Sequence, residues 1–67
     1  MTMGQKIKEL RKAKGLSRQK LANEIGVHQM SIAFWEKDKY FPTLLNCFCM
    51  ATLFKVSLDE LCCRDGE

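Results

Sequence analysis

The sequence contains no apolar run long enough to cross a bilayer. Its richest apolar stretch, residues 44–54, has eleven positions, whereas a transmembrane helix needs about 20. The segment from Met1 to Lys6 also lacks the apolar region of a secretory signal peptide. We therefore expect a cytoplasmic protein that does not enter a membrane.

Catalytic constellations are missing as well. No cysteine–histidine or carboxylate pair stands at the spacing of an activated nucleophile or an acid–base pair. A chain of 67 residues buries only about 60% of its unfolded surface, which leaves little room for the closed pocket of roughly 300 Å³ or more that small-molecule enzymes need. The prediction is a single domain over residues 1–67 that is not an enzyme and has no cofactor or small-molecule ligand.

The four cysteines do not show the spacing of a metal site. Zinc sites typically use Cys-x2-4-Cys pairs, but here the pairs are Cys47/Cys49 and Cys62/Cys63, with the single histidine, His28, far away in sequence. On a helix, Cys47 and Cys49 would lie about 200° apart and could not chelate one ion. We expect reduced structural thiols and no metal, with redox sensing and metal binding as the alternative hypotheses.

Negative charge is scarce at the amino-terminal end. The first 20 residues carry seven lysines and arginines against one glutamate, while the formal charge of the whole chain is +3. Such an end attracts nucleic acid or an acidic membrane surface, although a solvated helix face is the plainer interpretation.

Five helices and no strand are predicted, because no segment alternates apolar and polar residues for long enough. Their approximate ranges are 3–14, 17–26, 28–37, 43–54 and 57–64. Thr2 with Gln5, and Ser57 with Glu60, indicate capping boxes at the first and last helix starts. Only residues 25–27, which include Gly26, separate the second helix from the third, and this short turn predicts a helix-turn-helix unit over about residues 17–37.

Eight short blocks of sequence carry a resemblance to a known protein family, because their order and spacing match its pattern. The blocks are Ile7-Lys8-Glu9-Leu10-Arg11, Gly15-Leu16-Ser17, Leu21-Ala22, Gly26-Val27, Ser31-Ile32, Trp35-Glu36, Pro42-Thr43-Leu44 and Val56-Ser57-Leu58-Asp59-Glu60-Leu61. Together they resemble the lambda-repressor-like, Xre-type helix-turn-helix family over about residues 5–62. The resemblance implies a compact all-α domain of five helices. In that domain the second helix lies across the DNA backbone and the third enters the major groove.

The resemblance also implies which residues face DNA. The base-contact positions are His28, Gln29, Met30, Ala33 and Phe34. Gln29 is the one strong hydrogen-bonding reader, since its amide can pair bidentately with adenine, whereas Met30 and Phe34 could only press on thymine methyls or seal a protein contact. Phe34 could equally pack against Tyr40 or Phe41 of the following loop.

Phosphate contacts are expected on both sides of the third helix. They are Arg18, Gln19, Lys37, Lys39 and Tyr40. The chain departs from residues that are common in the family at Arg18, His28, Met30, Phe34, Asp38 and Lys55. At the last two positions the family often has glycine. Trp35 is expected in the core. Arg11 and Glu36 are expected to form a structural ion pair, as their counterparts do in many relatives.

Nine of the eleven residues from 44 to 54 are apolar, more than one helix stripe can bury in a monomer. The inward face is expected at Leu44, Cys47, Phe48, Ala51 and Phe54. The residues left for a dimer interface are then Leu45, Cys49, Leu53, Leu58 and Cys62. The prediction is a homodimer on double-stranded DNA with a palindromic operator.

The function predicted from these features is that of a sequence-specific DNA-binding transcriptional regulator, a bacterial or phage-type repressor. The alternative is a protein-interaction module, antitoxin-like, that keeps the fold but binds DNA weakly. The exposed apolar candidates Met30 and Phe34 favour this alternative.

Overall fold

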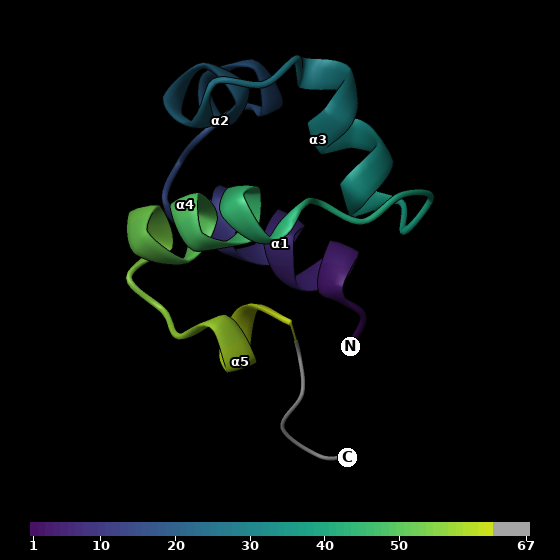
Figure 1. The fold of residues 1–67 in the computed structure, drawn as a ribbon. Coiled ribbons are helices and arrows are strands. Elements are labelled where there is room, and N and C mark those ends of the chain that lie inside the picture. Colours follow the sequence, from purple (N-terminus) through teal and green to yellow (C-terminus); the bar gives the residue numbers. More distant parts are fainter. Residues whose placement is uncertain (63–67) are drawn as a thin grey trace.

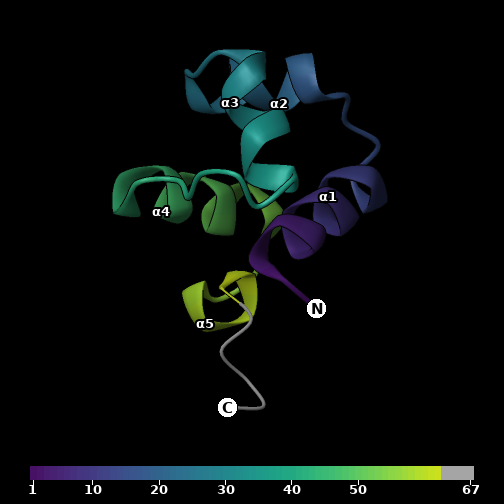
Figure 2. The ribbon, with the colours of Figure 1, turned by 90° about the vertical axis from the view of Figure 1, so that its right-hand side faces the viewer.

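A computed structural model describes residues 1–62, which form five helices and no strand. The helices are α1 Met3–Ala13, α2 Arg18–Ile25, α3 Gln29–Glu36, α4 Leu44–Phe54 and α5 Leu58–Leu61. α2 and α3 lie together at one end, α5 lies at the other, and α1 and α4 form the level between them (Figure 1 and Figure 2). The predicted all-α arrangement is confirmed. The predicted end of the fifth helix, near residue 64, falls outside the described residues.

Hydroxyl side chains begin four of the helices. Each accepts a hydrogen bond of 3.0–3.3 Å from the backbone N–H three residues later, which satisfies a helix donor that would otherwise lack a partner. The residues are Thr2, Ser17, Thr43 and Ser57. The capping box predicted at Thr2 and Gln5 is complete. At Ser57 only the hydroxyl half is formed, and the carboxylate of Glu60 lies 3.5 Å from Nζ of Lys6 on α1.

Four helix ends reverse through a residue with left-handed backbone. Gly15 and Gly26 have φ of 75° and 74°, and Asp38 and Lys55 both have φ of 59°. The next amide bonds a carbonyl five positions back in each case, as in the Schellman motif. Asp38 and Lys55 therefore keep the conformation that glycine adopts most easily, at a cost of about 1 kcal/mol or more each.

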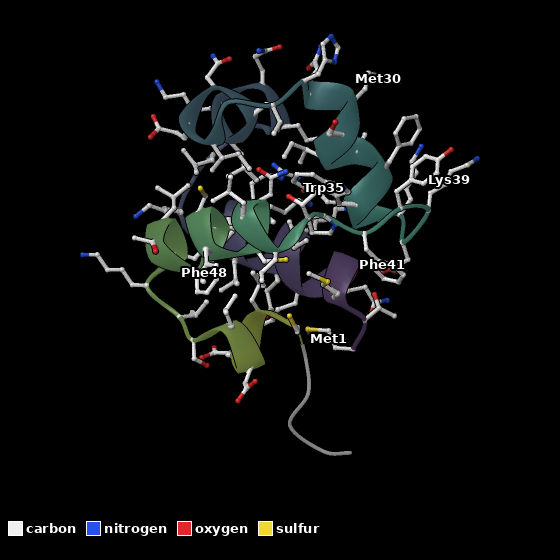
Figure 3. All side chains as sticks on the ribbon, in the orientation of Figure 1. Met1, Met30, Trp35, Lys39, Phe41 and Phe48 are labelled. Atoms are coloured by element: carbon white, nitrogen blue, oxygen red, sulfur yellow. The ribbon has the colours of Figure 1, made fainter. Side chains whose placement is uncertain are left out.

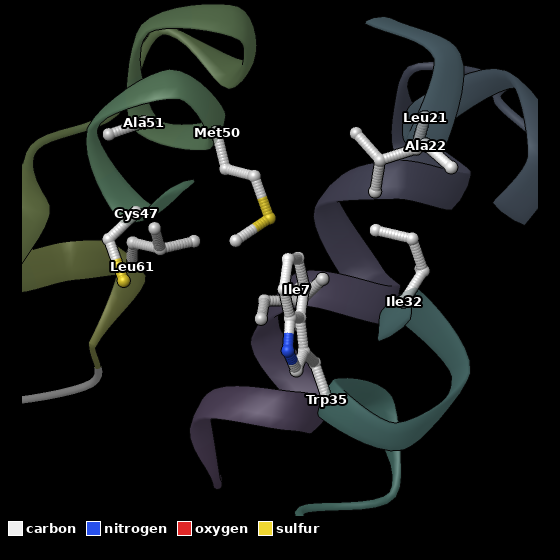
Figure 4. Close-up of a cluster of buried hydrophobic side chains, with 9 residues drawn as sticks. All are labelled: Ile7, Leu21, Ala22, Ile32, Trp35, Cys47, Met50, Ala51 and Leu61. Carbon is white, nitrogen blue, oxygen red and sulfur yellow. The ribbon is translucent and has the colours of Figure 1, made fainter. Parts of the chain in front are cut away.

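One hydrophobic core joins all five helices (Figure 4). The buried side chains are Ile7, Leu21, Ala22, Ile32, Trp35, Cys47, Met50, Ala51 and Leu61. Trp35 is 6% exposed, which confirms its predicted place in the core. Its indole lies among the other labelled core side chains in the close-up, and its size lets it fill a large share of a small interior.

The predicted inward face of α4 is partly wrong. Cys47 and Ala51 are buried as expected, but Met50 is fully buried, while Leu44 is 67% and Phe48 50% exposed. Since α4 is apolar almost all round, its periodicity could not select the buried stripe, and packing against the core selected it instead.

Among residues 1–62, three free cysteines are present and no group of side chains is arranged to hold a metal ion. Burial, and then the neighbouring Cys62 thiol, raise the pKa of Cys47. A raised pKa keeps this thiol protonated and weakly nucleophilic. Cys63 lies outside the described residues. No helix within the described part of the chain has the length and apolar character that a membrane span requires.

The predicted ion pair between Arg11 and Glu36 is formed. Arg11 donates from Nε to Oε2 of Glu36 at 2.6 Å and from Nη2 to Oε1 at 3.3 Å, and both residues are 7% exposed. Arg11 also donates from Nη1 to the carbonyl of Leu16 at 2.7 Å. Arg18, at the start of α2, donates from Nε to Oε1 of the same carboxylate at 3.0 Å. Glu36 therefore ties α3 to both α1 and α2.

We expect the three members of this network to differ in their effect on stability. Glu36→Ala should cost most, on the order of 3–5 kcal/mol, because it leaves a buried guanidinium without its carboxylate. Arg11→Ala should cost less, since Arg18 still holds the carboxylate. Arg18→Ala should cost within about 1 kcal/mol, because this side chain is 42% exposed. Urea unfolding of the three variants measures the order, and equal costs at all three positions would contradict it.

Candidate nucleic-acid interface

The turn between α2 and α3 sets the direction of α3. Ser17 begins α2, Gly26 ends it with a left-handed backbone, and the amide of Val27 bonds the carbonyl of Ala22 at 3.0 Å. The chain thus reverses within three residues, and α3 leaves at a steep angle to α2 (Figure 2). α3 points its core side chain Trp35 inward and Met30 outward (Figure 3).

Three predicted base-contact residues are exposed at the start of α3, namely His28, Gln29 and Met30. Ala33 and Phe34, one turn further on, are half-buried. The exposed group therefore occupies the helix end whose backbone N–H groups and dipole attract anionic partners.

His28 caps α3. Its Nδ1 accepts a hydrogen bond from the backbone N–H of Met30 at 3.1 Å. This bond satisfies one of the backbone donors at the start of α3, while the residue itself is exposed.

Phe34 packs against Tyr40 of the following loop. The two ring centroids are 5.3 Å apart, with the planes at 85°, an edge-to-face geometry that stabilises aromatic pairs. Phe41, the other predicted partner of Phe34, is 73% exposed. The contact with Tyr40 makes Phe34 a support for the loop and leaves less of its ring free to meet a base.

The predicted phosphate-contact residues flank α3 on two sides. Gln19 lies on α2 and donates from Nε2 to Oδ1 of Asn23 at 3.0 Å. Lys37, Lys39 and Tyr40 are exposed after the end of α3, and Lys39 extends away from the core (Figure 3). Polar and cationic side chains therefore lie on α2 before α3 and in the loop after the end of α3.

Two features of this surface escaped sequence-based reasoning. One is the bond from Arg18 to Glu36, which leaves the rest of the Arg18 guanidinium at the surface. The other is Asp38, whose carboxylate accepts from the amide of Gly4 at 2.9 Å and from Oγ1 of Thr2 at 2.6 Å. A glycine inside a predicted helix and an aspartate at a customary glycine position were the available signs of the second feature.

The predicted dimer residues are only partly on a free surface. Leu45 is 72% exposed and Cys49 is half-buried. Leu53 and Leu58, however, pack partly against the core, and Cys62 lies beside the buried Cys47. All three remain partly exposed, so their part in an interface stays a prediction.

The exposed apolar side chains of α4 are instead Leu44, Leu45 and Phe48, which we call the α4 apolar face. Beside it runs a groove of about 410 Å³ between the end of α2 and α4. The groove is lined by Glu24, Ile25, Phe48, Cys49, Thr52 and Leu53. The α4 apolar face and the exposed start of α3 are separate surfaces, as the positions of Phe48 and Met30 indicate (Figure 3).

Residues 7–61 match the helix-turn-helix family. An HTH-type transcriptional regulator of Archaeoglobus fulgidus is 34% identical over 65 residues, which make up 97% of this chain and 93% of that protein. The HTH-type transcriptional activator BcrR of Enterococcus faecalis is 33% identical over 61 residues, 91% of this chain. The match spans 30% of the length of BcrR.

Solved structures show the same fold. The restriction-modification controller protein C.AhdI from Aeromonas hydrophila has a TM-score of 0.80 at 34% identity, covering 88% of this chain and 89% of its own. The P22 c2 repressor in complex with a synthetic operator has a TM-score of 0.89 at 25% identity, covering 100% of this chain and 98% of its own. With the helix-turn-helix geometry, the Arg11–Glu36 pair and these matches in agreement, the chain belongs to the lambda-repressor-like helix-turn-helix family.

Proposed function

We propose that the chain is a sequence-specific DNA-binding transcriptional regulator of repressor type, which acts in the cytoplasm by covering its operator. The observation that carries the proposal is the likeness of the whole chain to the P22 c2 repressor bound to an operator, together with the exposed start of α3. The alternative of an antitoxin-like interaction module receives no support from the relatives, which are named as transcriptional regulators.

The direct test is selection of binding sites from random double-stranded DNA. Enrichment of one motif supports the proposal, and enrichment of a palindrome also supports two copies per site. No enrichment at low salt, where phosphate contacts are strongest, would overturn it.

Association should depend mainly on phosphates. Arg18, Lys37, Lys39 and Tyr40 offer donors beside α3, and the first 20 residues carry most of the positive charge. Each neutralised phosphate releases counterions, so log K should fall by about 0.9 per contact for each decade of salt. The phosphates supply affinity and register, and the start of α3 supplies sequence preference.

Gln29 should read one base pair. Its exposed amide at the first position of α3 can pair with adenine, so Gln29→Ala should cost roughly 1–3 kcal/mol on the cognate site and relax preference at that pair. Lys39→Ala is the matched control, because removal of a phosphate-binding side chain should weaken cognate and random DNA about equally. Fluorescence anisotropy on both DNAs measures this, and an equal loss for Gln29→Ala would remove its assigned role.

Met30 should recognise thymine by an apolar contact with the methyl group of the base. It is 51% exposed and offers no hydrogen-bond donor, so apolar contact is the readout left to it. Replacing thymine by uracil at the contacted position removes only that methyl and should weaken binding by about 0.8 kcal/mol, the free energy of burying one such group. The same replacement should have no effect on Met30→Ala. Equal sensitivity of wild type and variant would contradict this contact.

We further propose that two copies associate through the α4 apolar face and bind a palindromic operator. An exposed cluster of large apolar side chains typically marks an interface, and Leu44, Leu45 and Phe48 lie within two turns of an uncharged helix. Two-fold symmetry would set the recognition helices about 34 Å apart, one turn of DNA.

Leu45→Lys should disrupt the proposed dimer, since it puts a charge into an apolar contact. Ala13→Lys, which adds the same charge at an exposed position of α1, should leave association unchanged. Sedimentation equilibrium at tens of micromolar distinguishes them. A wild-type protein that is wholly monomeric both alone and on its operator would refute the dimer while leaving DNA binding intact.

A further inference from the structure

Asp38 joins the end of α3 to the beginning of α1. Its Oδ1 accepts from the backbone amide of Gly4 at 2.9 Å, and its Oδ2 accepts from Oγ1 of Thr2 at 2.6 Å. Gly4 is buried, and a Cβ added to it would lie 2.4 Å from the carbonyl oxygen of Trp35. The start of α1 and the end of α3 thus approach closely because residue 4 has no side chain.

The carboxylate is well suited to this place. The first amides of α1 have no partner within the helix and carry the positive end of its dipole, and Asp38 supplies a negative acceptor to one of them. Charge-assisted bonds of this kind are stronger than neutral ones. They offset the left-handed backbone of Asp38, with φ of 59°, which glycine would adopt without cost.

The loop that follows is held at two further points. The amide of Lys39 bonds the carbonyl of Phe34 at 2.9 Å, and the ring of Tyr40 packs edge-on against the ring of Phe34. Residues 37–40 are therefore fixed both to α3 and, through Asp38, to α1. Three of these four residues, Lys37, Lys39 and Tyr40, are the exposed phosphate-contact candidates.

We propose that Asp38 is a positioning residue for DNA binding, which holds the loop of residues 37–40 in register with the phosphate backbone by anchoring it to the start of α1. This role rests on the proposed function. Pre-ordered donors give up less conformational freedom on binding than mobile ones. A loop released from α1 should therefore bind fewer phosphates, although the protein remains folded.

Asp38→Gly tests the role, with Lys55→Gly as the control for the change of backbone conformation alone. Both substitutions place glycine at a left-handed position with φ of 59°, and both should relieve backbone strain. Lys55 follows the last residue of α4, whereas the loop of residues 37–40 precedes the first residue of that helix. Only Asp38→Gly removes bonds to Thr2 and Gly4, so only this variant should bind operator DNA more weakly and show a smaller dependence of log K on log salt.

The slope of log K against log salt should become smaller by about 0.9 for each phosphate that the variant no longer neutralises. Asp38→Asn is the second variant, because it keeps the size of the side chain but replaces one accepting oxygen with a donor, and it should show a smaller change in the same direction. Circular dichroism establishes that each variant is folded at the binding temperature. A change in unfolding midpoint without a change in salt dependence would mean a structural role only and would overturn the proposal.

The two proposals fail in different ways. In the first case the wild type binds DNA and Lys39→Ala lowers the salt dependence, but Asp38→Gly binds in the same way as Lys55→Gly. This result would reject the positioning role and leave the proposed function standing. Absence of salt-dependent DNA binding by the wild type would reject both.

Discussion

The arrangement of the first three helices depends on the ion pairs that the buried carboxylate of Glu36 forms with two arginines. This carboxylate receives Arg11 from the last turn of α1 and Arg18 from the first position of α2, while Glu36 itself ends α3. A carboxylate whose side chain is 1% exposed must be fully partnered, because the cost of desolvating a charge is otherwise not recovered. With both guanidiniums in place, no buried side-chain nitrogen or oxygen among residues 1–62 lacks a hydrogen-bond partner. The network thereby ties the orientation of α3 to that of α1 and α2.

Asp38 complements Glu36 two residues later. Glu36 fixes α3 to the last turn of α1, and Asp38 fixes the chain beyond α3 to the first turn of α1. Two carboxylates thus attach one short helix to both ends of another. Such helices have little intrinsic stability in isolation, so these attachments and the shared core determine how α3 is presented. These bonds fix the orientation of α3 relative to α1 in a chain of only 67 residues.

The proposed DNA-binding surface and the proposed self-association surface lie on different helices. His28, Gln29 and Met30 are exposed at the start of α3, while Leu44, Leu45 and Phe48 are exposed on α4. Under the proposed function the two contacts would not compete for one surface, although Met30 and Phe41 also expose apolar side chains on and after α3. α4 contributes to both the core and the α4 apolar face, since its apolar residues exceed the single stripe that the core can cover.

The sequence by itself determined the five helices, the turn at Gly26 and the core position of Trp35, because caps, glycine stops and helical spacing act over a few residues. The Arg11–Glu36 pair joins distant residues and was predicted through the family resemblance instead. The resemblance also indicated which residues near α3 could face DNA, and that assignment stays a prediction. Tertiary structure alone decided that Met50 is buried while Phe48 is exposed, that Arg18 joins Glu36, and that Asp38 reaches Thr2 and Gly4. These outcomes depend on contacts between residues 18 to 36 positions apart, or on which side of a uniformly apolar helix meets the core, and local sequence patterns carry no information about either.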